Sequence, residues 1–416
     1  MTTGRMTIKR VGVVGIAGLW FGVVGSVQGG AAQDWPQWRG PNRDGATTFS
    51  VPGSWPDRLE PQWQVEVGSG HATPVLVGDA VYMFTRVEED EVMTALDART
   101  GERRWQTSYP APFELFVNTS AHGPGPKSTP TYADGRLFTL GMSSIVTAFD
   151  AETGRQLWQH PATEARPRYH TALSPVVDGD LVIVHVGGPE AAVLKALDVA
   201  SGEVRWSWED DSPAYGSPIV VDLGGTRQVV MFTHRYLLGM AVASGELLWS
   251  RPFTTPRDTT AQTPILYRDM LVHSGRESGV TAFRLVPQAG KWDTEDVWHT
   301  SDVALHMTNG VAVDGVFYGL SHLNSGQYFG LDLDTGDVLW TSEPRQAENA
   351  AMVRSGDTIF SLEDDAEMVV FGASRSGFEP VRRYEVAMSS TWAQPAIAGD
   401  RFYVKDVSTL ALWTLD

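Results

Sequence analysis

Short apolar runs separated by tight polar turns recur along most of the chain. Residues 72–84 read ATPVLVGDAVYMF and residues 128–140 read STPTYADGRLFTL, and related phrases begin at residues 173, 216, 262, 308 and 394. Most units place a Gly/Asp turn between two short alternating segments, which is typical of a β-hairpin. No segment shows a convincing helical period over ten or more residues, so the pattern predicts an all-β protein.

A second phrase closes most units, and ALDARTGERRW at residues 95–105 is its first example. An Asp is followed four residues later by Gly, and a Trp comes four residues after the Gly. The carboxylate can accept backbone N–H groups of the turn, and Gly can adopt a positive φ. The Trp is large enough to fill the gap between adjacent sheets. We predict these structural roles for Asp97, Gly101, Trp105, Asp150, Gly154, Trp158, Asp198, Gly202, Trp206, Gly245, Trp249, Asp332, Gly336 and Trp340.

The spacing of the aromatic residue predicts the architecture. It recurs at positions 63, 105, 158, 206, 249, 298, 340 and 384. A period in the forties with four short strands per unit is typical of a β-propeller. Residues 393–416 supply only three strands, so we expect the strand around Trp63 to complete the last blade and remove an exposed edge. We therefore predict an eight-bladed propeller of four-stranded antiparallel blades, with seven blades as the alternative.

The N-terminus is typical of a secretory signal peptide. A basic start at Arg5, Lys9 and Arg10 precedes the apolar run 11–24, and small residues follow up to Ala32. The run is short and glycine-rich for a membrane span, so we expect cleavage near Ala32. We expect the mature protein to be periplasmic or secreted, with no transmembrane span.

The chain is thus expected to have three parts. Residues 1–32 form the signal peptide, and residues 61–416 form a single propeller domain. We expect the segment between them, residues 33–60, to pack on the propeller, with Trp35, Trp38 and Trp55 clamping it to the propeller's side.

Composition excludes several functions. Lys+Arg 32 against Asp+Glu 50 gives a net charge of −18, so binding to nucleic acid or to an anionic membrane surface is not expected. The absence of cysteine excludes disulfides, thiolate metal sites, cysteine nucleophiles and lipidation of an N-terminal cysteine.

The acidic runs 88–91 and 363–365 are expected to be solvated hairpin tips. We expect a monomer.

The repeats resemble those of pyrroloquinoline-quinone (PQQ) type propellers. The opening DWPQWRGPNRDG at residues 34–45 is also similar to the start of bacterial exported proteins with such repeats. The resemblance spans nearly the whole mature chain. It implies a relation to quinoprotein alcohol dehydrogenases, which bind PQQ and Ca²⁺ in a central funnel. It equally implies a relation to the propeller lipoprotein of the outer-membrane β-barrel assembly machinery, which binds protein partners.

This chain departs from both branches, because it has neither the adjacent-cysteine disulfide of the alcohol dehydrogenases nor a lipobox cysteine. The cofactor is therefore left open, with PQQ and Ca²⁺ as one option. The partner, a small ligand or an envelope protein, is left open as well.

Candidate functional residues gather in the predicted loops between blades, where propellers usually bind ligands. Eight of the ten histidines are predicted to lie toward one face, but no HxH or HxxxH spacing occurs, so no metal site is predicted. Basic and amide groups there could meet the carboxylates of a quinone, and Trp392 could stack on a flat ring. The residues predicted for this ligand- or cofactor-binding face are His71, His122, Lys127, Arg168, His170, Tyr215, Arg257, Gln262, His306, Asn309, Trp392 and Gln394.

No motif in the sequence indicates a catalytic nucleophile, acid or base. The long loop 107–127 is expected to be a lid or a docking element. The sequence favours an exported propeller that acts as a ligand- or protein-binding or scaffolding module in the cell envelope. The alternative is a periplasmic PQQ-dependent dehydrogenase that oxidises alcohols or sugars, so enzymatic activity is left open.

Overall fold

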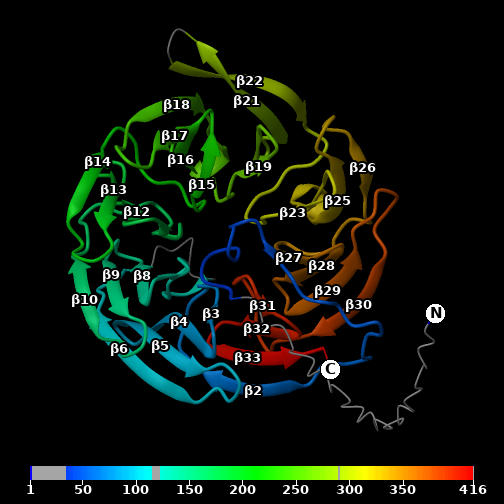
Figure 1. Cartoon of the computed structure of the whole chain (residues 1–416), viewed down its shortest axis with the longest axis horizontal. Helices are drawn as coiled ribbons and strands as arrows, with labels where there is room; N and C mark the ends of the chain where they lie inside the picture. The colour runs from blue at the N-terminus through cyan, green and yellow to red at the C-terminus, as the bar shows by residue number, and fades with distance from the viewer. Residues whose placement is uncertain (2–33, 115–121, 289–290, 416) are drawn as a thin grey trace. The chain divides into compact units, whose positions relative to one another are not determined.

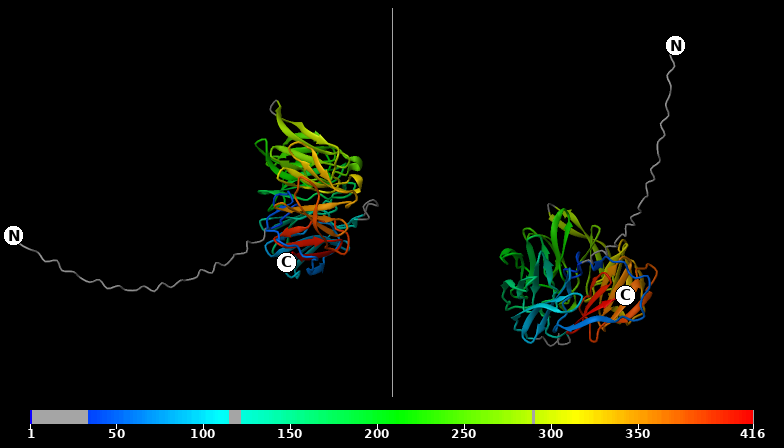
Figure 2. Two further views of the ribbon diagram at one scale, coloured as in Figure 1. Left: turned by 90° about the vertical axis from the view of Figure 1, so that its right-hand side faces the viewer. Right: turned by 60° about the horizontal axis from the view of Figure 1, so that its bottom comes forward.

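Eight sheets stand in a ring around a central channel in the computed structural model (Figure 1), which describes residues 1, 34–114, 122–288 and 291–415. Each sheet is one blade, and the blades are numbered in chain order. Seven sheets have four strands, and the seventh blade has a fifth, short strand. The first strands of neighbouring blades lie close together and surround the channel, and the fourth strands lie at the rim. Figure 2 shows the ring edge-on. The prediction of an eight-bladed propeller is confirmed, and the seven-bladed alternative is wrong.

Blades 1 to 4 follow one another directly in the chain. Blade 1 comprises β3 (Val75–Val77), β4 (Ala80–Val87), β5 (Asp90–Asp97) and β6 (Arg103–Pro110), and blade 2 comprises β7 (Thr131–Ala133), β8 (Arg136–Leu140), β9 (Val146–Asp150) and β10 (Gln156–His160). Blade 3 comprises β11 (Val176–Asp178), β12 (Leu181–Val186), β13 (Val193–Asp198) and β14 (Val204–Trp208), and blade 4 comprises β15 (Ile219–Leu223), β16 (Thr226–Phe232), β17 (Tyr236–Ala241) and β18 (Leu247–Pro252).

Blades 5 to 7 continue the same order. Blade 5 comprises β19 (Ile265–Tyr267), β20 (Met270–Ser274), β21 (Val280–Gln288) and β22 (Lys291–Thr300), and blade 6 comprises β23 (Val311–Val313), β24 (Val316–Ser321), β25 (Gln327–Asp332) and β26 (Val338–Thr341). Blade 7 comprises β27 (Ala350–Ser355), β28 (Thr358–Glu363), β29 (Glu367–Gly372) and β30 (Pro380–Glu385), with β1 (Ala46–Thr47) added in parallel. Two single-turn 3₁₀ helices, Pro256–Asp258 and Leu323–Ser325, lie in loops.

The two ends of the propeller meet in blade 8. Its strands are β31 (Ala396–Ala398), β32 (Arg401–Lys405), β33 (Thr409–Thr414) and, at the rim, β2 (Pro61–Glu66). β2 pairs antiparallel with β33, and Trp63 lies opposite Leu412. The prediction that the strand around Trp63 completes the last blade is confirmed. This pairing removes a free strand edge and ties the start of the ring to its end.

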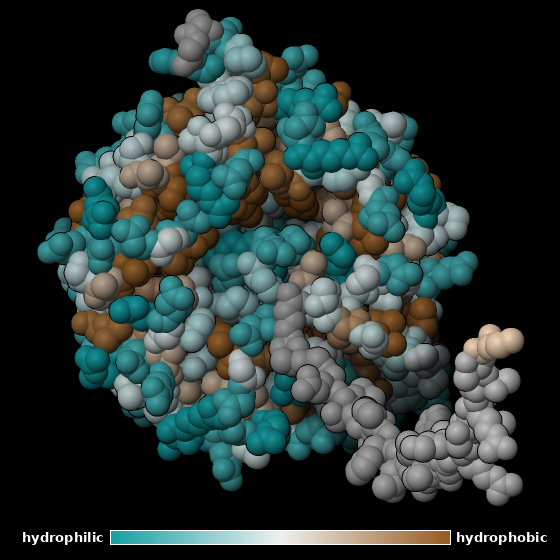
Figure 3. Space-filling view, viewed as in Figure 1, coloured by the Kyte–Doolittle hydropathy of each residue, from teal (hydrophilic) through white to brown (hydrophobic). Residues whose placement is uncertain are grey.

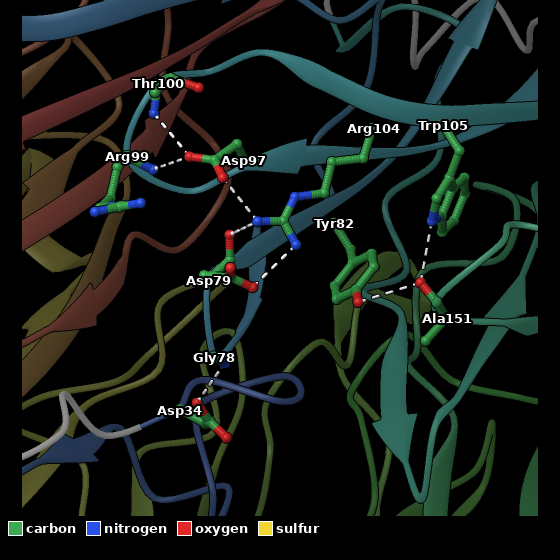
Figure 4. Close-up of polar contacts among 10 residues, drawn as sticks. All are labelled: Asp34, Gly78, Asp79, Tyr82, Asp97, Arg99, Thr100, Arg104, Trp105 and Ala151. Atoms are coloured by element: carbon green, nitrogen blue, oxygen red, sulfur yellow. Dashed lines mark hydrogen bonds and ion pairs between the residues drawn. The ribbon is translucent and has the colours of Figure 1, made fainter.

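The repeated Asp, Gly and Trp residues connect most blades to the next. In blade 1 the Asp97 carboxylate accepts the backbone N–H groups of Arg99 at 3.0 Å and Thr100 at 3.1 Å (Figure 4). The Arg104 guanidinium donates to the same carboxylate at 2.7 Å and lowers the pKa of Asp97 to about 2. Trp105 donates through Nε1 to the carbonyl oxygen of Ala151 in blade 2 at 3.0 Å.

The tryptophan ring lies on the turn glycine of the following blade, which explains why that position carries no side chain. A Cβ atom at any of these glycines would come within 3.0 Å of the ring in the pairs Trp63–Gly101, Trp105–Gly154, Trp158–Gly202, Trp206–Gly245 and Trp298–Gly336. Trp249 differs, because it donates to the Gln228 side chain of its own blade. The next blade has no Asp-Gly turn there and instead has the long β21–β22 hairpin, which projects from the rim (Figure 1).

Residues 34–47, which we call the N-terminal plug, enter the channel (Figure 1). Trp35 is fully buried and its backbone N–H donates to Leu76 of blade 1 at 2.7 Å, whereas Trp38 donates through Nε1 to Thr263 of blade 5 at 2.9 Å. The expectation that Trp35 and Trp38 clamp the segment to the side of the propeller is therefore wrong, because both lie inside the ring. Trp55 packs at the rim, with its ring 6.1 Å from that of Phe360 in blade 7.

The plug is hydrogen-bonded to every blade. In each case the partner belongs to the first strand of the blade or to the residues just before it. These partners are Leu76, Tyr132, Pro175, Pro218, Thr263, Gly310, Arg354 and Ile397, for blades 1 to 8 in order. In Figure 3, hydrophilic residues fill the middle of the face on which the plug enters. The channel is thus closed from this side.

The acidic runs are only partly solvated. Glu91 and Glu363 are buried, with 0% and 1% of their surface exposed. Glu91 accepts the Tyr109 hydroxyl at 2.8 Å, and Glu363 accepts the Tyr328 hydroxyl at 2.7 Å. The expectation of solvated tips is wrong for these two residues, because strand alternation turns their side chains between neighbouring blades.

Candidate functional site

A cavity of about 560 Å³ occupies the other end of the channel, on the side of the inter-blade loops. We call it the funnel cavity. Trp38 of the plug lines it, and most other lining residues come from the loops that precede the first strands. Arg276 is an exception, because it lies between the second and third strands of blade 5.

The structure brings nine of the twelve predicted site residues together in this cavity. They are His71, His122, Lys127, Arg168, Tyr215, Arg257, His306, Asn309 and Trp392. That these residues bind a ligand stays a prediction.

The other three predicted site residues are buried beside the cavity. Gln262 donates to the carbonyl oxygens of His306 and Thr308 at 2.9 and 2.8 Å, and Gln394 donates to that of Met352 at 3.0 Å. The ring of His170 packs 4.3 Å from that of Phe113. Gln262 and Gln394 thus hold neighbouring blades together.

Sequence reasoning did not find nine further lining residues. They are Trp38, Tyr169, Ala172, Ser217, Thr259, Ala261, Arg276, Met307 and Asn349. Ser217 and Asn349 lie one or two residues before a first strand, as several predicted residues do, so the repeat register was a usable signal. No comparable signal pointed to Trp38.

The cavity is cationic although the whole chain is acidic. Lys127, Arg168, Arg257 and Arg276 line it, and no aspartate or glutamate is found among the lining residues that the structure describes. Glu277, next in sequence to Arg276, pairs with that guanidinium at 3.4 Å and offsets part of its charge. Lys127, Arg168 and Arg257 bring three more cationic side chains to the same concave surface. This concentration of positive charge favours an anionic ligand.

Burial sets the protonation of the other basic groups. It lowers the pKa of Lys127 to about 8, so this amine is charged at neutral pH. Burial also lowers the pKa of His71 and of His306 to about 4 in each case, and both imidazoles are neutral there. The positive charge of the cavity therefore resides on lysine and arginine.

Aromatic groups form part of the wall. The His122 ring meets that of Trp392 edge-on at 4.4 Å, and the His122 carbonyl oxygen accepts His71 Nε2–H at 2.8 Å. Across the cavity the Tyr215 hydroxyl accepts the backbone N–H of Tyr169 at 3.2 Å. A ligand with a flat ring and acidic substituents would find both ring faces and cations here.

The same residues do not suit Ca²⁺. Calcium takes six to eight oxygen ligands, usually with carboxylates among them, and the described lining offers none. The amide oxygens of Asn309 and Asn349 already accept Thr263 N–H at 2.7 Å and the Thr308 hydroxyl at 3.0 Å. Among all described residues, no group of three or more His, Asp or Glu could hold a metal ion. The cavity thus fits the carboxylates and ring of a quinone such as PQQ, but not the Ca²⁺ that accompanies PQQ in the dehydrogenases.

The chain is a closed propeller of the PQQ-repeat class. Three features define it: β2 closes the ring, Asp-Gly-Trp turns recur in the blades, and a funnel cavity lies in the channel. A family model described as outer membrane protein assembly factor BamB matches residues 89–342, and the chain belongs to this family. Among curated relatives, BamB of Yersinia pestis is 24% identical over 326 residues, which is 75% of this chain and 70% of that protein. Methanol dehydrogenase [cytochrome c] subunit 1 of Paracoccus denitrificans is 27% identical over 163 residues, and the match covers 36% of this chain but only 25% of that protein.

Solved structures agree with the fold. BamB from Moraxella catarrhalis superposes with a TM-score of 0.63 at 15% identity and covers 86% of this chain and 97% of its own. Quinohemoprotein alcohol dehydrogenase from Comamonas testosteroni superposes with a TM-score of 0.62 at 14% identity, over 93% of this chain and 82% of its own. Both branches of the class thus share this architecture. In the described part of the chain, no helix has the length and apolar character needed to cross a membrane.

Proposed function

We propose that this chain is a binding module of the cell envelope and that its funnel cavity holds a small organic anion. The observation that supports this function is the set of cations, Lys127, Arg168, Arg257 and Arg276, in a cavity whose described lining contains no carboxylate. In a chain of net charge −18, such a cavity would draw an anion toward the channel. The envelope location rests on the predicted signal peptide and on the family.

A second candidate is a periplasmic PQQ-dependent dehydrogenase. The aromatic wall around Trp392 and the cations of the cavity favour it, because a quinone with carboxylate groups fits both. Bound PQQ would supply hydride-accepting chemistry, and the residues of this chain would bind and orient it. The described lining offers no aspartate or glutamate to accept a substrate proton, so the binding module remains our first proposal.

Titration of the purified mature protein distinguishes the two functions. PQQ and a set of aliphatic and aromatic carboxylates are added with and without Ca²⁺, and tryptophan fluorescence is followed, since Trp38 and Trp392 line the cavity. Saturable, calcium-independent quenching by carboxylates supports the binding module. Calcium-dependent PQQ binding with reduction of a dye by an alcohol or sugar would replace it with the dehydrogenase.

Two variants test whether the cavity is the site. We expect Arg257→Gln to weaken anion binding by roughly tenfold to a hundredfold, the value of one hydrogen bond to a charged group. Arg155→Gln, at an exposed turn outside the cavity, is the matched control and should bind as the wild type does. Equal affinity of the wild type and both variants, or no quenching by any anion tested, would overturn the proposal.

A further inference from the structure

Two buried arginines of the N-terminal plug bind three of the eight blades. Arg39 and Arg43 expose only 1% and 4% of their surface. Arg43 donates to the carbonyl oxygens of Pro218, at 2.9 Å, and Pro175, and Arg39 donates to that of Gly310 at 2.6 Å. These carbonyls stand at the start of the first strands of blades 4, 3 and 6. A ring of strand edges therefore presents acceptors to the channel, and the two guanidinium groups supply the donors.

This arrangement is selective for arginine. A guanidinium carries five N–H donors in a fixed fork, so one side chain can reach carbonyls of two blades at once, as Arg43 does. Arg43 also donates through Nε to the Gln37 side chain at 2.9 Å, within the plug. None of the hydrogen bonds described for either guanidinium goes to a carboxylate. The channel therefore binds the guanidinium groups through the arrangement of their N–H donors and not through an ion pair.

The backbone of the plug has a conformation that the channel must maintain. Arg39 and Arg43 have φ values of +61° and +57°, in the left-handed region that non-glycine residues rarely occupy. Gly40 lies against Trp35, where a Cβ atom would come within 2.9 Å of the ring. Such strained residues persist where surrounding contacts determine them, as at a recognition site.

The plug is connected to the ring by a segment that lies outside the blades. The plug pairs with blade 1 through the bridge between Trp35 and Leu76 and with blade 7 through β1 (Ala46–Thr47), and residues 48–60 then lead to β2. Gly53 and Ser54 in this segment are exposed, and nothing lies within 4 Å of a Cβ built at Gly53. The chain can therefore be cut here without breaking a strand.

We propose that the channel is a peptide-binding site for a segment with two arginines four residues apart, and that the plug is its ligand, joined to the ring covalently but separable from it. Docking of this ligand places Trp38 at the floor of the funnel cavity. The proposal goes beyond the binding of a small anion and does not rest on it.

A nicked protein tests the proposal. A recognition sequence for a site-specific protease is inserted between Gly53 and Ser54 of the full chain, and the folded protein is cut. We expect the N-terminal fragment to co-elute with the ring in size-exclusion chromatography. A labelled peptide of residues 34–49 should then exchange into the nicked protein while the circular dichroism of the ring stays unchanged.

Matched peptides measure the recognition. A peptide with Arg39→Met and Arg43→Met should bind the nicked protein at least a hundredfold more weakly than the wild-type peptide. A peptide with Asn42→Ala is the control and should bind as the wild type does, because Asn42 is exposed. Equal binding of all three peptides would overturn the proposal. So would unfolding of the ring when the fragment leaves, since the segment would then be part of the core.

A second measurement applies if the insertion prevents folding. In the full chain carrying Arg39→Met and Arg43→Met, hydrogen exchange is followed at two backbone amides of the plug. The Trp35 amide donates to the carbonyl oxygen of Leu76 in blade 1, and the Gly45 amide donates to that of Arg39. We expect these amides to lose protection while amides of the blade strands keep it. Equal loss of protection in plug and blades would contradict a separable ligand.

Discussion

Gly154 offers a direct test of how the tryptophans hold adjacent blades. It lies in the turn between β9 and β10 of blade 2, with a φ of +73°, and the Trp105 ring of blade 1 covers it. A Cβ atom at Gly154 would lie 2.6 Å from Trp105 Cδ2, closer than real Cβ contacts come. In Gly154→Ala the ring must therefore shift, and its hydrogen bond to Ala151 at 3.0 Å is lost or lengthened.

The structure allows the magnitude to be worked out. A positive φ costs an L-residue about 1–2 kcal/mol, and displacement of a packed ring costs about 1–3 kcal/mol. Loss of the hydrogen bond adds about 1 kcal/mol. Gly135→Ala is the matched control, because Gly135 lies in the same blade with a φ of +76° and nothing within 4 Å of a Cβ. We expect Gly154→Ala to be more destabilising than this control by about 2–4 kcal/mol.

Urea unfolding followed by circular dichroism and tryptophan fluorescence measures the difference. The double variant Trp105→Leu, Gly154→Ala provides an internal check, since the smaller side chain leaves room for the new methyl group. Its loss of stability should be less than the sum of the two single losses. Equal destabilisation by Gly154→Ala and Gly135→Ala would refute the idea that the tryptophan fills the gap between blades.

Three further predictions follow from charged groups. Because burial lowers the pKa of Lys127 to about 8, anion affinity measured by quenching should fall as pH rises through that value, and Lys127→Met should remove the dependence. Burial raises the pKa of Glu363 above its unfolded value to about 7, so stability should fall between pH 4.5 and 7 by up to about 3 kcal/mol. Urea midpoints should show that Glu363→Gln removes this fall, whereas the exposed Glu379→Gln keeps it. Asp97→Ala, which deletes the acceptor of two backbone N–H groups and of Arg104, should cost about 1–2 kcal/mol by the same assay.

The propeller could be predicted from the sequence because its determinants are local and repeated. An Asp, a Gly and a Trp at fixed spacing recur together at residues 97–105, 150–158, 198–206 and 332–340, so the same local signal is repeated along the chain. Trp63 extended that register to the N-terminal strand, which made the closure of blade 8 visible. Trp249 and Trp340 deviate because no turn glycine of blade 5 or blade 7 lies under their rings, and they donate instead to the side chain of Gln228 and the carbonyl oxygen of Ser374.

The site could be predicted only in part, because a register places a residue near the channel without fixing the direction of its side chain. Asn309 lines the funnel cavity, whereas Gln262 and Gln394, in similar loops, turn to carbonyls of the neighbouring blade. The prediction that Glu91 and Glu363 are solvated was wrong for the same reason, since a run of acidic residues does not indicate which side chain faces inward.

The plug could not be predicted from the sequence for a different reason. Most of its partners are backbone carbonyl and N–H groups, which every blade has and no residue type encodes, and the Thr263 hydroxyl is an exception. The motif WRGPNRDG shows a tight turn with two arginines, but these residues do not indicate what the guanidinium groups bind. Only closure of the ring brings the acceptors of different blades around one axis.

The two halves of the channel have related electrostatics. On the plug side Arg39 and Arg43 are buried and donate to carbonyl oxygens, and none of the hydrogen bonds described for their guanidinium groups goes to a carboxylate. The Asp44 carboxylate offsets part of the Arg39 charge, whereas no carboxylate acts on Arg43 in this way. Electrostatic potentials add, so Arg43 raises the positive potential in the adjoining funnel cavity, where Lys127 and three further arginines already lie. Neutralising Arg43 should therefore weaken anion binding in the cavity even though it does not line it, and the effect should shrink at high salt. An anion that bound equally well with the plug arginines replaced would show that the cavity cations act alone.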